Sequence, residues 1–371
     1  MDCLIEWNYV NTNNDGSGYK DKLVDLKYKY SNENYMKLSD EGREAMSEEV
    51  FQIYRSRNIF PITYYTDKEV HKEIEKCINK DFEFTGDLLN HRFNQGSSLL
   101  KWMFPNSNNT FLGTDNRTML NKFYTDHTLR RAINFALKYD KHAQPTRVQG
   151  GLRMIGGSTT TNFKAMHAKA LCERYCPEGG TVYDFSCGFG GRMLGALSSK
   201  NNYKYIGVEP CVETYSSLLK LGSYIEEVTD RKDSYEIHNI GSEDFLGEAN
   251  SVDFAFSSPP YFNLEKYSDE PTQCYNKYPE IDEWFEGYVK KTIQNTYDML
   301  KAGGVYAVNI ADFKLNNKQV NYVDKWIEMS EEIGFTFKEQ LHMRLQSRGK
   351  DRHTENGKEI ERKEGIFVFT K

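Results

Sequence analysis

The chain has 371 residues and a formal net charge of −6, which excludes a global basic field of the kind that attracts nucleic acid; a polyanion site would have to be a local patch. Its length predicts one large or two modest domains, and its apolar content is ample for a core. Seven cysteines, an odd number scattered along the chain, do not form a disulfide framework and fit a reducing compartment.

Targeting and metal signals are absent from the sequence. The amino-terminal residues show no basic segment followed by an apolar run, so no signal peptide is expected. No apolar run approaches the ~20 residues of a membrane span. Cys172 and Cys176 lie one helical turn apart, but no second cysteine or histidine pair follows them, so no metal site is expected. We therefore expect a soluble, cytoplasmic protein without a bound metal.

The first 150 residues predict a mainly helical accessory region. Capping residues and apolar periodicity predict four helices, at residues 39–55, 66–79, 99–104 and 129–137. The region contains no visible repeat and no catalytic constellation. One of its helices carries a basic cluster that either faces a phosphate backbone or forms a solvated face, the second being favoured: Arg130, Arg131, Lys138 and Lys141.

Glycines in residues 149–157 predict a loop and a domain boundary, dividing the chain into residues 1–150 and 151–371. A capped helix is expected at 159–175. Strands then alternate with helices, the strands at 181–186, 203–209, 235–240, 252–257 and 305–310 and the helices at 191–197, 212–228, 282–300 and 322–333. Gly303-Gly304 predicts the stop of the third of these helices. Two final strands, 335–345 and 365–370, have no helix between them. The pattern predicts an α/β fold with a doubly wound, mostly parallel seven-stranded sheet and a terminal antiparallel hairpin.

The first strand of this region ends in a glycine-rich turn, Asp184-Phe-Ser-Cys-Gly-Phe-Gly-Gly191. Its glycines let the backbone turn sharply and approach a ligand closely. The second strand ends in Glu209-Pro210, where a carboxylate suits ribose hydroxyls, and the third is followed by the acidic loop Gly241-Ser-Glu-Asp-Phe245. The turn matches neither the Gly-x-Gly-x-x-Gly dinucleotide pattern nor a phosphate loop. Acidic loops without a phosphate-binding lysine suit a ligand with a ribose, an amine and an adenine.

The fourth strand runs into Ser258-Pro-Pro-Tyr-Phe262. Proline has a fixed φ and no amide hydrogen, so a central strand cannot continue through Pro259 and Pro260. The Ser258 hydroxyl and the Pro259 carbonyl can accept the two N–H bonds of an exocyclic amine. Tyr261 supplies a face on which a base rotated out of its duplex can stack.

These two motifs resemble those of the S-adenosylmethionine-dependent methyltransferases, and specifically of the exocyclic-amino (N4-cytosine and N6-adenine) DNA methyltransferases. The resemblance covers roughly residues 159–371 and implies a Rossmann-like fold. Residues 184–191 resemble the cofactor motif, and residues 258–261 resemble the Asp/Asn/Ser-Pro-Pro-Tyr/Phe catalytic motif. A C5-cytosine enzyme would need a Pro-Cys nucleophile after the fourth strand, whereas Pro210-Cys211 follows the second, so that role is rejected.

The resemblance implies a site for S-adenosylmethionine and a catalytic site. The implied cofactor residues are Asn162, Phe163, Asp184, Ser186, Gly188, Gly190, Gly191, Glu209, Pro210, Glu243 and Asp244. Among them Glu209 would hold the ribose, Asp244 or Glu243 the adenine amino group, and residues 161–163, expected on the helix before the first strand, the methionine end. The implied catalytic residues are Ser258, Pro259, Pro260 and Tyr261. Candidates for contacts with the substrate are Phe262 and Tyr267 at the base, where a structural loop role is equally open. Arg348 and Arg352 are candidates for contacts with the backbone, where a solvated hairpin loop is equally open.

The serine that heads the catalytic motif favours N4 of cytosine, since N6-adenine enzymes of the family more often carry Asp or Asn there. About 65 residues separate the two motifs, which leaves no room for a recognition domain between them, so target recognition falls to residues 1–150. We therefore expect a site-specific DNA methyltransferase that flips its base, with a companion restriction or defence component left open. The alternatives are an N6-adenine DNA methyltransferase, an RNA base or protein glutamine methyltransferase, and a non-catalytic cofactor-binding scaffold.

Overall fold

The computed structural model describes most of the chain and divides it into two compact units. The described residues are Leu26 and residues 29–56, 58, 60–81, 86, 88–89, 93–112, 117–155, 160–344, 354–355, 358–359 and 363–371. The first unit comprises Met1–Lys72 and Lys101–Thr160, and the second comprises Glu73–Leu100 and Thr161–Lys371. Residues 73–100 therefore group with the second unit, whereas the sequence placed them in a first domain of residues 1–150.

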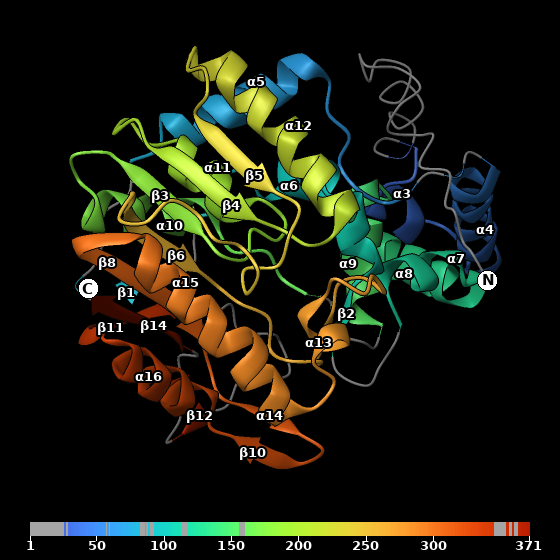
Figure 1. The fold of residues 1–371 in the computed structure, drawn as a ribbon. Helices are drawn as coiled ribbons and strands as arrows, with labels where there is room; N and C mark the ends of the chain where they lie inside the picture. Colours follow the sequence, from blue (N-terminus) through green and yellow to red (C-terminus); the bar gives the residue numbers. More distant parts are fainter. Residues whose placement is uncertain are drawn as a thin grey trace. The chain divides into compact units, whose positions relative to one another are not determined.

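The first unit is mainly helical (Figure 1). Its elements are α3 (Asn32–Met36), α4 (Asp40–Ser56), the 3₁₀ helix η1 (Pro105–Asn109), β2 (Phe111–Leu112), α7 (Met119–Tyr124), α8 (Asp126–Tyr139) and α9 (Pro145–Met154). Two further helices cross the division between the units, α5 (Asp67–Ile78) and α6 (Ser97–Met103). The four predicted helices are confirmed as α4, α5, α6 and α8.

Caps and apolar spacing explain these helices. The Ser39 hydroxyl accepts a hydrogen bond from the Gly42 amide at 3.2 Å at the start of α4. Thr66 and Glu69 form a reciprocal capping box at the start of α5, with bonds of 3.3 and 2.9 Å. Helix α8 packs against α4 and α9 through buried residues at helical spacing, namely Leu129, Ala132, Ile133, Ala136 and Leu137.

The loop predicted at residues 149–157 is wrong over most of its length, because α9 continues to Met154. Gly151 lies where α9 packs on α8, and a Cβ at this position would lie 2.6 Å from the Ala132 carbonyl oxygen. The glycine therefore permits a close helix–helix contact instead of a turn.

The second unit contains the predicted sheet. Its strands are β1 (Leu88–Leu89), β3 (Thr181–Asp184), β4 (Lys204–Val208), β5 (Tyr235–His238), β6 (Val252–Ser257), β8 (Leu300–Ile310), β11 (Thr336–Arg344) and β14 (Lys363–Thr370). Their order across the sheet is β1-β11-β14-β8-β6-β3-β4-β5. The strands from β5 to β8 are parallel, and β14 runs antiparallel between β8 and β11. The predicted seven-stranded, mostly parallel sheet with its terminal hairpin is confirmed, with the two-residue β1 added at one edge.

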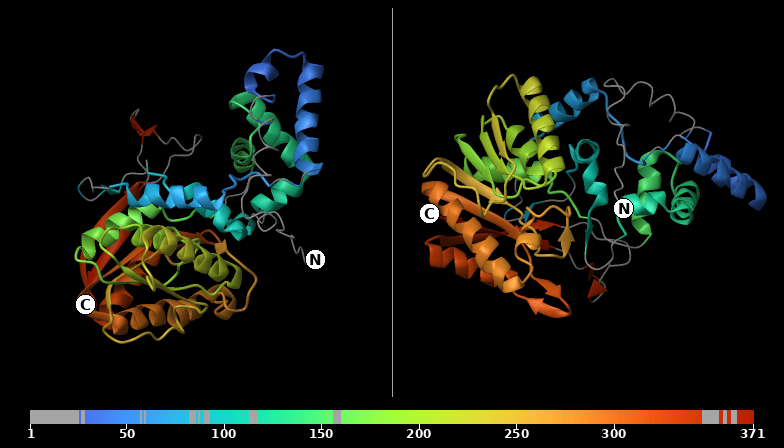
Figure 2. Two further views of the ribbon diagram at one scale, coloured as in Figure 1. Left: turned by 90° about the horizontal axis from the view of Figure 1, so that it is seen from above. Right: turned by 45° about the vertical axis from the view of Figure 1, so that its right-hand side comes forward.

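Helices cover both faces of this sheet (Figure 1, Figure 2). The helices within residues 160–344 are α10 (Ala165–Tyr175), α11 (Gly191–Leu197), α12 (Val212–Thr229), α13 (Cys274–Lys277), α14 (Ile281–Trp284), the π-helix η2 (Phe285–Lys290), α15 (Lys291–Met299) and α16 (Tyr322–Ile333). Short strands complete the unit: β7 (Glu265–Lys266), β9 (Phe313–Leu315), β10 (Lys318–Val320), β12 (Thr354–Glu355) and β13 (Lys358–Glu359).

Alternate side chains of β6 face the two helical layers. The Phe254 ring lies 5.6 Å from that of Tyr175 at the end of α10, and the Phe256 ring lies 5.1 Å from that of Phe163. Ala255, between them, belongs to the apolar cluster of the opposite face, which contains Trp284. This period of two is expected of a strand buried on both faces.

The predicted helix 282–300 forms, but its stop differs from the prediction. A π-helical turn, Phe285–Lys290, interrupts it, and the α-helix ends at Met299. Leu300 is already extended, at φ −74° and ψ 138°, and pairs with Val252 as the first residue of β8. Gly303-Gly304 therefore lies inside β8, because pairing with β6 begins before the glycines are reached.

A buried lysine joins two parts of the second unit that are distant in sequence. Lys169 on α10 is 1% exposed, and its ammonium donates to the carbonyls of Cys77, Ile78 and Lys80 at 2.9–3.1 Å, at the end of α5. We expect Lys169→Met to lower the free energy of unfolding by about 2–4 kcal/mol, because it leaves these acceptors without their donor. Urea titration measures the effect, with exposed Lys200→Met as the control; a loss equal to that of the control would contradict this role.

Candidate functional site

Four parallel strands bring the predicted site residues to one edge of the sheet. β5, β4, β3 and β6 are successive neighbours, so their carboxyl ends lie together. The glycine-rich turn follows β3, Glu209 follows β4, Glu243 follows β5 and Ser258 follows β6. In open α/β sheets this is the edge at which ligands bind.

The glycine-rich turn needs its glycines. Gly188 and Gly190 have φ of +53° and +70°, values that other residues rarely adopt. A Cβ on Gly191 would lie 2.0 Å from the Phe163 carbonyl oxygen, and the Asn162 amide donates to the Phe189 carbonyl at 2.6 Å. The segment before α10 therefore lies against the turn.

The sequence predicted Asn162 and Phe163 on a helix, but in the structure both lie before the helix begins. α10 starts at Ala165, and Lys164 before it is extended, at φ −76° and ψ 125°. The Asn162 side chain is committed to the turn, and Phe163 packs its ring on Phe256 and beneath the Arg192 guanidinium. The close approach of this segment to Gly191 explains why it stays extended.

Asp184 is a buried hub beneath the turn. Its Oδ1 accepts from the Ser257 hydroxyl at 2.7 Å and the Ser186 amide at 3.1 Å. Its Oδ2 accepts from Arg192 Nε at 2.8 Å and the Tyr205 hydroxyl at 2.6 Å. Asp184 is 0% exposed, and its carboxylate holds the glycine-rich turn and the end of β6 together.

Ser186 and Pro210 were both predicted in the cofactor site, and both form hydrogen bonds with other groups of the protein. The Ser186 hydroxyl donates to the Phe185 carbonyl at 2.6 Å and lies 3.2 Å from the Tyr288 hydroxyl. The Pro210 carbonyl accepts from the Thr272 hydroxyl at 3.2 Å. Ser186 lies within the turn and Pro210 follows β4, and the Ser186 hydroxyl and the Pro210 carbonyl already have protein partners.

Glu209 joins the turn to the end of β4. Its two carboxylate oxygens accept from the Gly188 amide at 2.9 Å and the Cys211 amide at 3.0 Å. Burial raises the pKa of Glu209 to about 7, and the two amide bonds oppose this shift. The carboxylate therefore shapes the turn, and its role in holding a ribose stays a prediction.

The raised pKa of Glu209 predicts how stability depends on pH. The folded chain holds this proton up to about pH 7, whereas the group loses it near its ordinary value of 4.5 when unfolded. Between these values the folded state binds more protons, so the free energy of unfolding should fall as pH rises. Glu209→Gln should flatten this decline in urea titrations from pH 4.5 to 7.5, whereas exposed Glu331→Gln should not. An unchanged slope in Glu209→Gln would contradict the burial of a titrating carboxyl here.

The acidic loop after β5 is paired with a lysine that the sequence reading missed. Lys277 Nζ lies 2.6 Å from Glu243 Oε1 and also contacts the Asp244 carboxylate. The Asn295 amide donates to the Ser242 and Glu243 carbonyls at 2.9 and 3.2 Å, which fixes the loop on α15. Lys277 is more than 30 residues away in sequence, so only the fold reveals the pairing.

Residues 258–261 present two acceptors that have no partner among the described residues. β6 ends at Ser257, whose hydroxyl is bound to Asp184, and Ser258 and Pro259 follow it outside the strand. Within the described part of the chain no hydrogen bond engages the half-buried Ser258 hydroxyl or the Pro259 carbonyl. The next carbonyl, of Pro260, accepts from the Tyr322 hydroxyl at 3.3 Å. Two neighbouring acceptors are thus left for a ligand at the end of β6.

Tyr261 is held in place by its hydroxyl and its ring edges. The hydroxyl donates to Glu364 Oε1 on β14 at 2.6 Å. The ring makes edge contacts with Phe313 and Tyr322, with centroids 6.0 and 5.8 Å away. Burial, chiefly, raises the pKa of both Tyr261 and Glu364. Glu364 is a second residue that the sequence reading missed, since 103 positions separate it from Tyr261.

Phe262 and Tyr267, the candidates for base contacts, have different places. Phe262 is 2% exposed and packs on Trp284, so its ring belongs to the core instead of a base pocket. Its φ of +50° is strained for an aromatic residue and turns the chain sharply after the motif. The Tyr267 ring lies 6.1 Å from that of Phe189 in the glycine-rich turn, and its hydroxyl donates to Glu265.

Residues 264–277, which we call the strap, lead back from residues 258–261 to the loops that follow β4 and β5. The Glu270 carboxylate accepts from the Val212 amide at 3.2 Å, at the start of α12. Thr272 bonds to the Pro210 carbonyl, and Lys277 ends the strap on the acidic loop. The Tyr275 hydroxyl fixes the strap internally by accepting from the Tyr267 and Ser268 amides, both at 3.1 Å. One segment therefore contacts three of the four strand ends.

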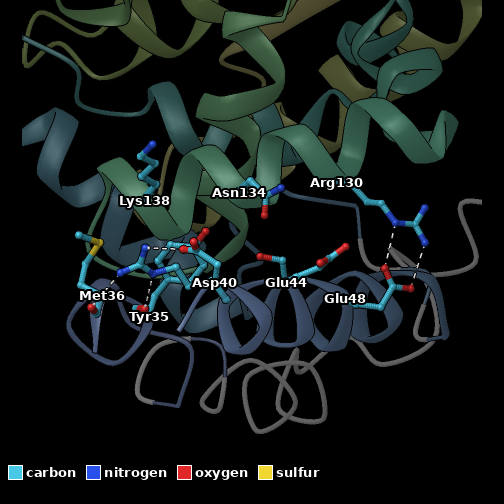
Figure 3. A pocket seen from close by; sticks show the side chains of 10 residues that line it. Tyr35, Met36, Asp40, Glu44, Glu48, Arg130, Asn134 and Lys138 are labelled. Atoms are coloured by element: carbon cyan, nitrogen blue, oxygen red, sulfur yellow. Dashed lines mark hydrogen bonds and ion pairs between the residues drawn. The ribbon is translucent and has the colours of Figure 1, made fainter. Parts of the chain in front are cut away.

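Of the predicted backbone contacts, Arg348 and Arg352 lie outside the described residues. In the first unit, Arg130 is committed to a bidentate ion pair with Glu48 at 2.9 and 3.0 Å (Figure 3). The exposed members of the basic cluster are Arg131, Lys138 and Lys141. A cavity of about 490 Å³ lies between α3, α4 and α8 and contains none of the predicted site residues; it is lined by Tyr35, Met36, Asp40, Arg43, Glu44, Ser47, Glu48, Arg130, Asn134 and Lys138.

The described ranges hold neither a candidate metal cluster nor a candidate membrane span. No cluster of three or more histidine, cysteine or acidic side chains there has a geometry that could hold a metal ion. None of the helices built from the described residues is both long and apolar enough to cross a membrane.

Comparison with known proteins finds structural similarity without sequence similarity. No family model and no curated protein sequence matches the chain. Similar solved structures include the [4+2]-cyclase SpnF, at 14% identity, TM-score 0.35 and 48% coverage of this chain. A phosphoethanolamine N-methyltransferase from Haemonchus contortus has 13% identity, TM-score 0.36 and 55% coverage of this chain. This chain spans 60% of the cyclase and 52% of that methyltransferase.

A third similar structure is a TehB-like S-adenosylmethionine-dependent methyltransferase from Corynebacterium glutamicum. It has 16% identity and TM-score 0.34, with 57% of this chain and 89% of that chain covered. The function proposed below depends on the residues of the site and on their geometry.

Proposed function

We propose that this chain is an S-adenosylmethionine-dependent methyltransferase that acts on an exocyclic amine of a nucleic-acid base, with N4 of cytosine in DNA as the favoured target. The observation that carries the proposal is the pair of acceptors at Ser258 and Pro259, which lack partners in the described chain. Ser257 beside them is bonded to Asp184, so the pair is fixed relative to the glycine-rich turn.

The residues at the strand ends fit the methyl donor. The turn at Gly188 and Gly190 offers close backbone approach, and the Glu209 carboxylate lies at the end of the neighbouring strand. Glu243 supplies a buried carboxylate oxygen without a partner in the described chain, which suits an amino group. When bound, the cofactor supplies an electrophilic methyl group on a sulfonium.

The catalytic residues act by orienting the amine. The lone pair of an exocyclic amine is delocalised into the ring, so the group is a poor nucleophile. Hydrogen bonds from its two N–H groups to the Ser258 hydroxyl and the Pro259 carbonyl hold the nitrogen and direct its lone pair out of the ring plane. Positioning of this kind is worth several orders of magnitude in rate and requires no covalent intermediate.

Tyr261 and its anchor prepare a surface for the base. Glu364 fixes the hydroxyl, and the edge contacts with Phe313 and Tyr322 fix the ring plane. A ring held in this way can stack a flipped base without losing rotamer entropy on binding. The first unit, with its exposed Arg131, Lys138 and Lys141, is proposed to contact the nucleic-acid backbone.

Nucleoside mass spectrometry after expression in a bacterial host tests the proposal. N4-methylcytosine in the host DNA is the expected product. N6-methyladenine would correct the base, and modified RNA with unmodified DNA would overturn the DNA assignment. Calorimetry with S-adenosylhomocysteine tests whether the chain binds the cofactor, and binding without any methylated product would favour a non-catalytic scaffold. Methylation of a protein glutamine amide with unmodified nucleic acids would overturn the nucleic-acid assignment.

A further inference from the structure

Lys277 forms a charged contact that is partly shielded from water. Its ammonium lies 2.6 Å from Glu243 Oε1, and the Lys277 and Glu243 side chains are 26% and 1% exposed. The same ammonium also contacts the more exposed Asp244. Although partial burial lowers it, hydrogen bonds to Asp244 and Glu243 raise the pKa of Lys277 above its ordinary value, so this donor stays charged.

The loop that carries Glu243 has little freedom. Asn295 binds the Ser242 and Glu243 carbonyls, and the Ser242 hydroxyl lies 2.7 Å from that of Thr292. A Cβ on Gly241 would lie 2.3 Å from Glu243 Oε2, so the carboxylate rests against the glycine. The site is therefore organised before a ligand arrives.

One oxygen of this carboxylate lacks a partner. Glu243 is 5% exposed, and no donor in the described chain reaches its Oε2 atom. A buried acceptor without a donor is costly, and a ligand N–H would remove the cost. The carboxylate of Glu243 and the ammonium of Lys277 thus place an acceptor and a donor side by side.

We propose that Lys277 is a specificity-determining residue that, together with the Glu243 and Asp244 carboxylates, recognises the adenine of the methyl donor; the inference rests on the proposed function. Adenine carries an amino donor next to the acceptor nitrogen N1. Hypoxanthine carries a carbonyl acceptor next to an N1–H donor, so the order is reversed. The carboxylates accept from the adenine amino group and the ammonium donates to N1, whereas hypoxanthine sets acceptor against acceptor and donor against donor.

The test compares two ligands that differ only at this edge, S-adenosylhomocysteine and S-inosylhomocysteine. Their affinities are measured by calorimetry for the wild type, Lys277→Met, Lys277→Arg and Lys290→Met. Lys290 is the matched control, because its ammonium also lies near two carboxylates, those of Glu286 and Glu332, at 3.6 and 3.7 Å. Unlike Glu243, both of these carboxylates are exposed. We expect Lys277→Met to reduce the preference for the adenine compound about tenfold, the effect of losing one charge-assisted bond. Lys277→Arg and Lys290→Met should keep the wild-type preference for the adenine compound.

The outcomes separate the inference from the proposed function. If the wild type binds neither compound, the proposed function fails. Suppose that the wild type prefers the adenine compound and that Lys277→Met has the same ratio of the two affinities, whether or not both affinities fall. The inference is then overturned and the proposed function stands. Should Lys277→Met fail to fold, Glu243→Gln replaces it: its amide offers both a donor and an acceptor, so the ratio should fall, and an unchanged ratio overturns the inference.

Discussion

Replacing Ser258 by alanine should reduce the rate of methyl transfer by at least about 100-fold, because one of the two acceptors that hold the amine is lost. The affinity for S-adenosylhomocysteine should stay the same, since the Ser258 hydroxyl has no bond to the glycine-rich turn or to the acidic loops in the described chain. Tyr261→Ala should lose transfer to a similar extent through the missing stacking surface. Tyr261→Phe, which keeps the ring but loses the hydroxyl bond to Glu364, should be intermediate.

Single-turnover kinetics with a labelled methyl donor measures these effects, and calorimetry measures cofactor affinity. Ser216→Ala is a suitable control, because this exposed serine bonds only locally, to the Val212 carbonyl of its own helix. A Ser258→Ala variant with the wild-type rate would show that the amine is not held at this position.

Replacing Asp184 by alanine should lower the free energy of unfolding by about 3–5 kcal/mol, the usual cost of removing one partner of a buried ion pair. The Arg192 and Asp184 side chains are 7% and 1% exposed, so the guanidinium would be left buried without its carboxylate. The hydroxyls of Ser257 and Tyr205 would lose their acceptor as well. Cofactor affinity should fall in parallel, since the glycine-rich turn is built on the same carboxylate.

Urea titration and calorimetry with S-adenosylhomocysteine check this prediction. Asp298→Ala, on the exposed side of α15, serves as the control. An Asp184→Ala variant with unchanged stability would contradict the claim that the Asp184 carboxylate stabilises the fold. One that is destabilised but binds the cofactor as well as the wild type would separate the turn from the cofactor site.

The sequence predicted the fold well because its signals are local. The alternation of strands and helices, the apolar run of β6 and the glycines of the turn are readable within a few residues of each other. Two local signals misled. Gly151 was read as a loop residue although its role is to let α9 approach Ala132, and Gly303-Gly304 was read as a helix stop although β8 had already begun. Glycine reports a backbone requirement, and only tertiary structure decides which one.

The site was predictable where one motif contains its own chemistry, and not where partners come from far along the chain. Ser258-Pro-Pro-Tyr261 identified its acceptors directly. Glu364 and Lys277 carry no local pattern, and they become visible only when β14 and the strap meet the site. Asp184 was read as a ligand for the cofactor, but its four donors are all protein groups, which no spacing rule could indicate.

The most direct test of the central claim is mass spectrometry of DNA incubated with the purified protein and S-adenosylmethionine that carries a trideuterated methyl group. We predict N4-(trideuteromethyl)cytosine with the wild type and none with Ser258→Ala. Two results would contradict the claim that Ser258 and Pro259 present an amine to the methyl donor. One is that the wild type labels no exocyclic amine of any base, and the other is that Ser258→Ala transfers the label as well as the wild type does.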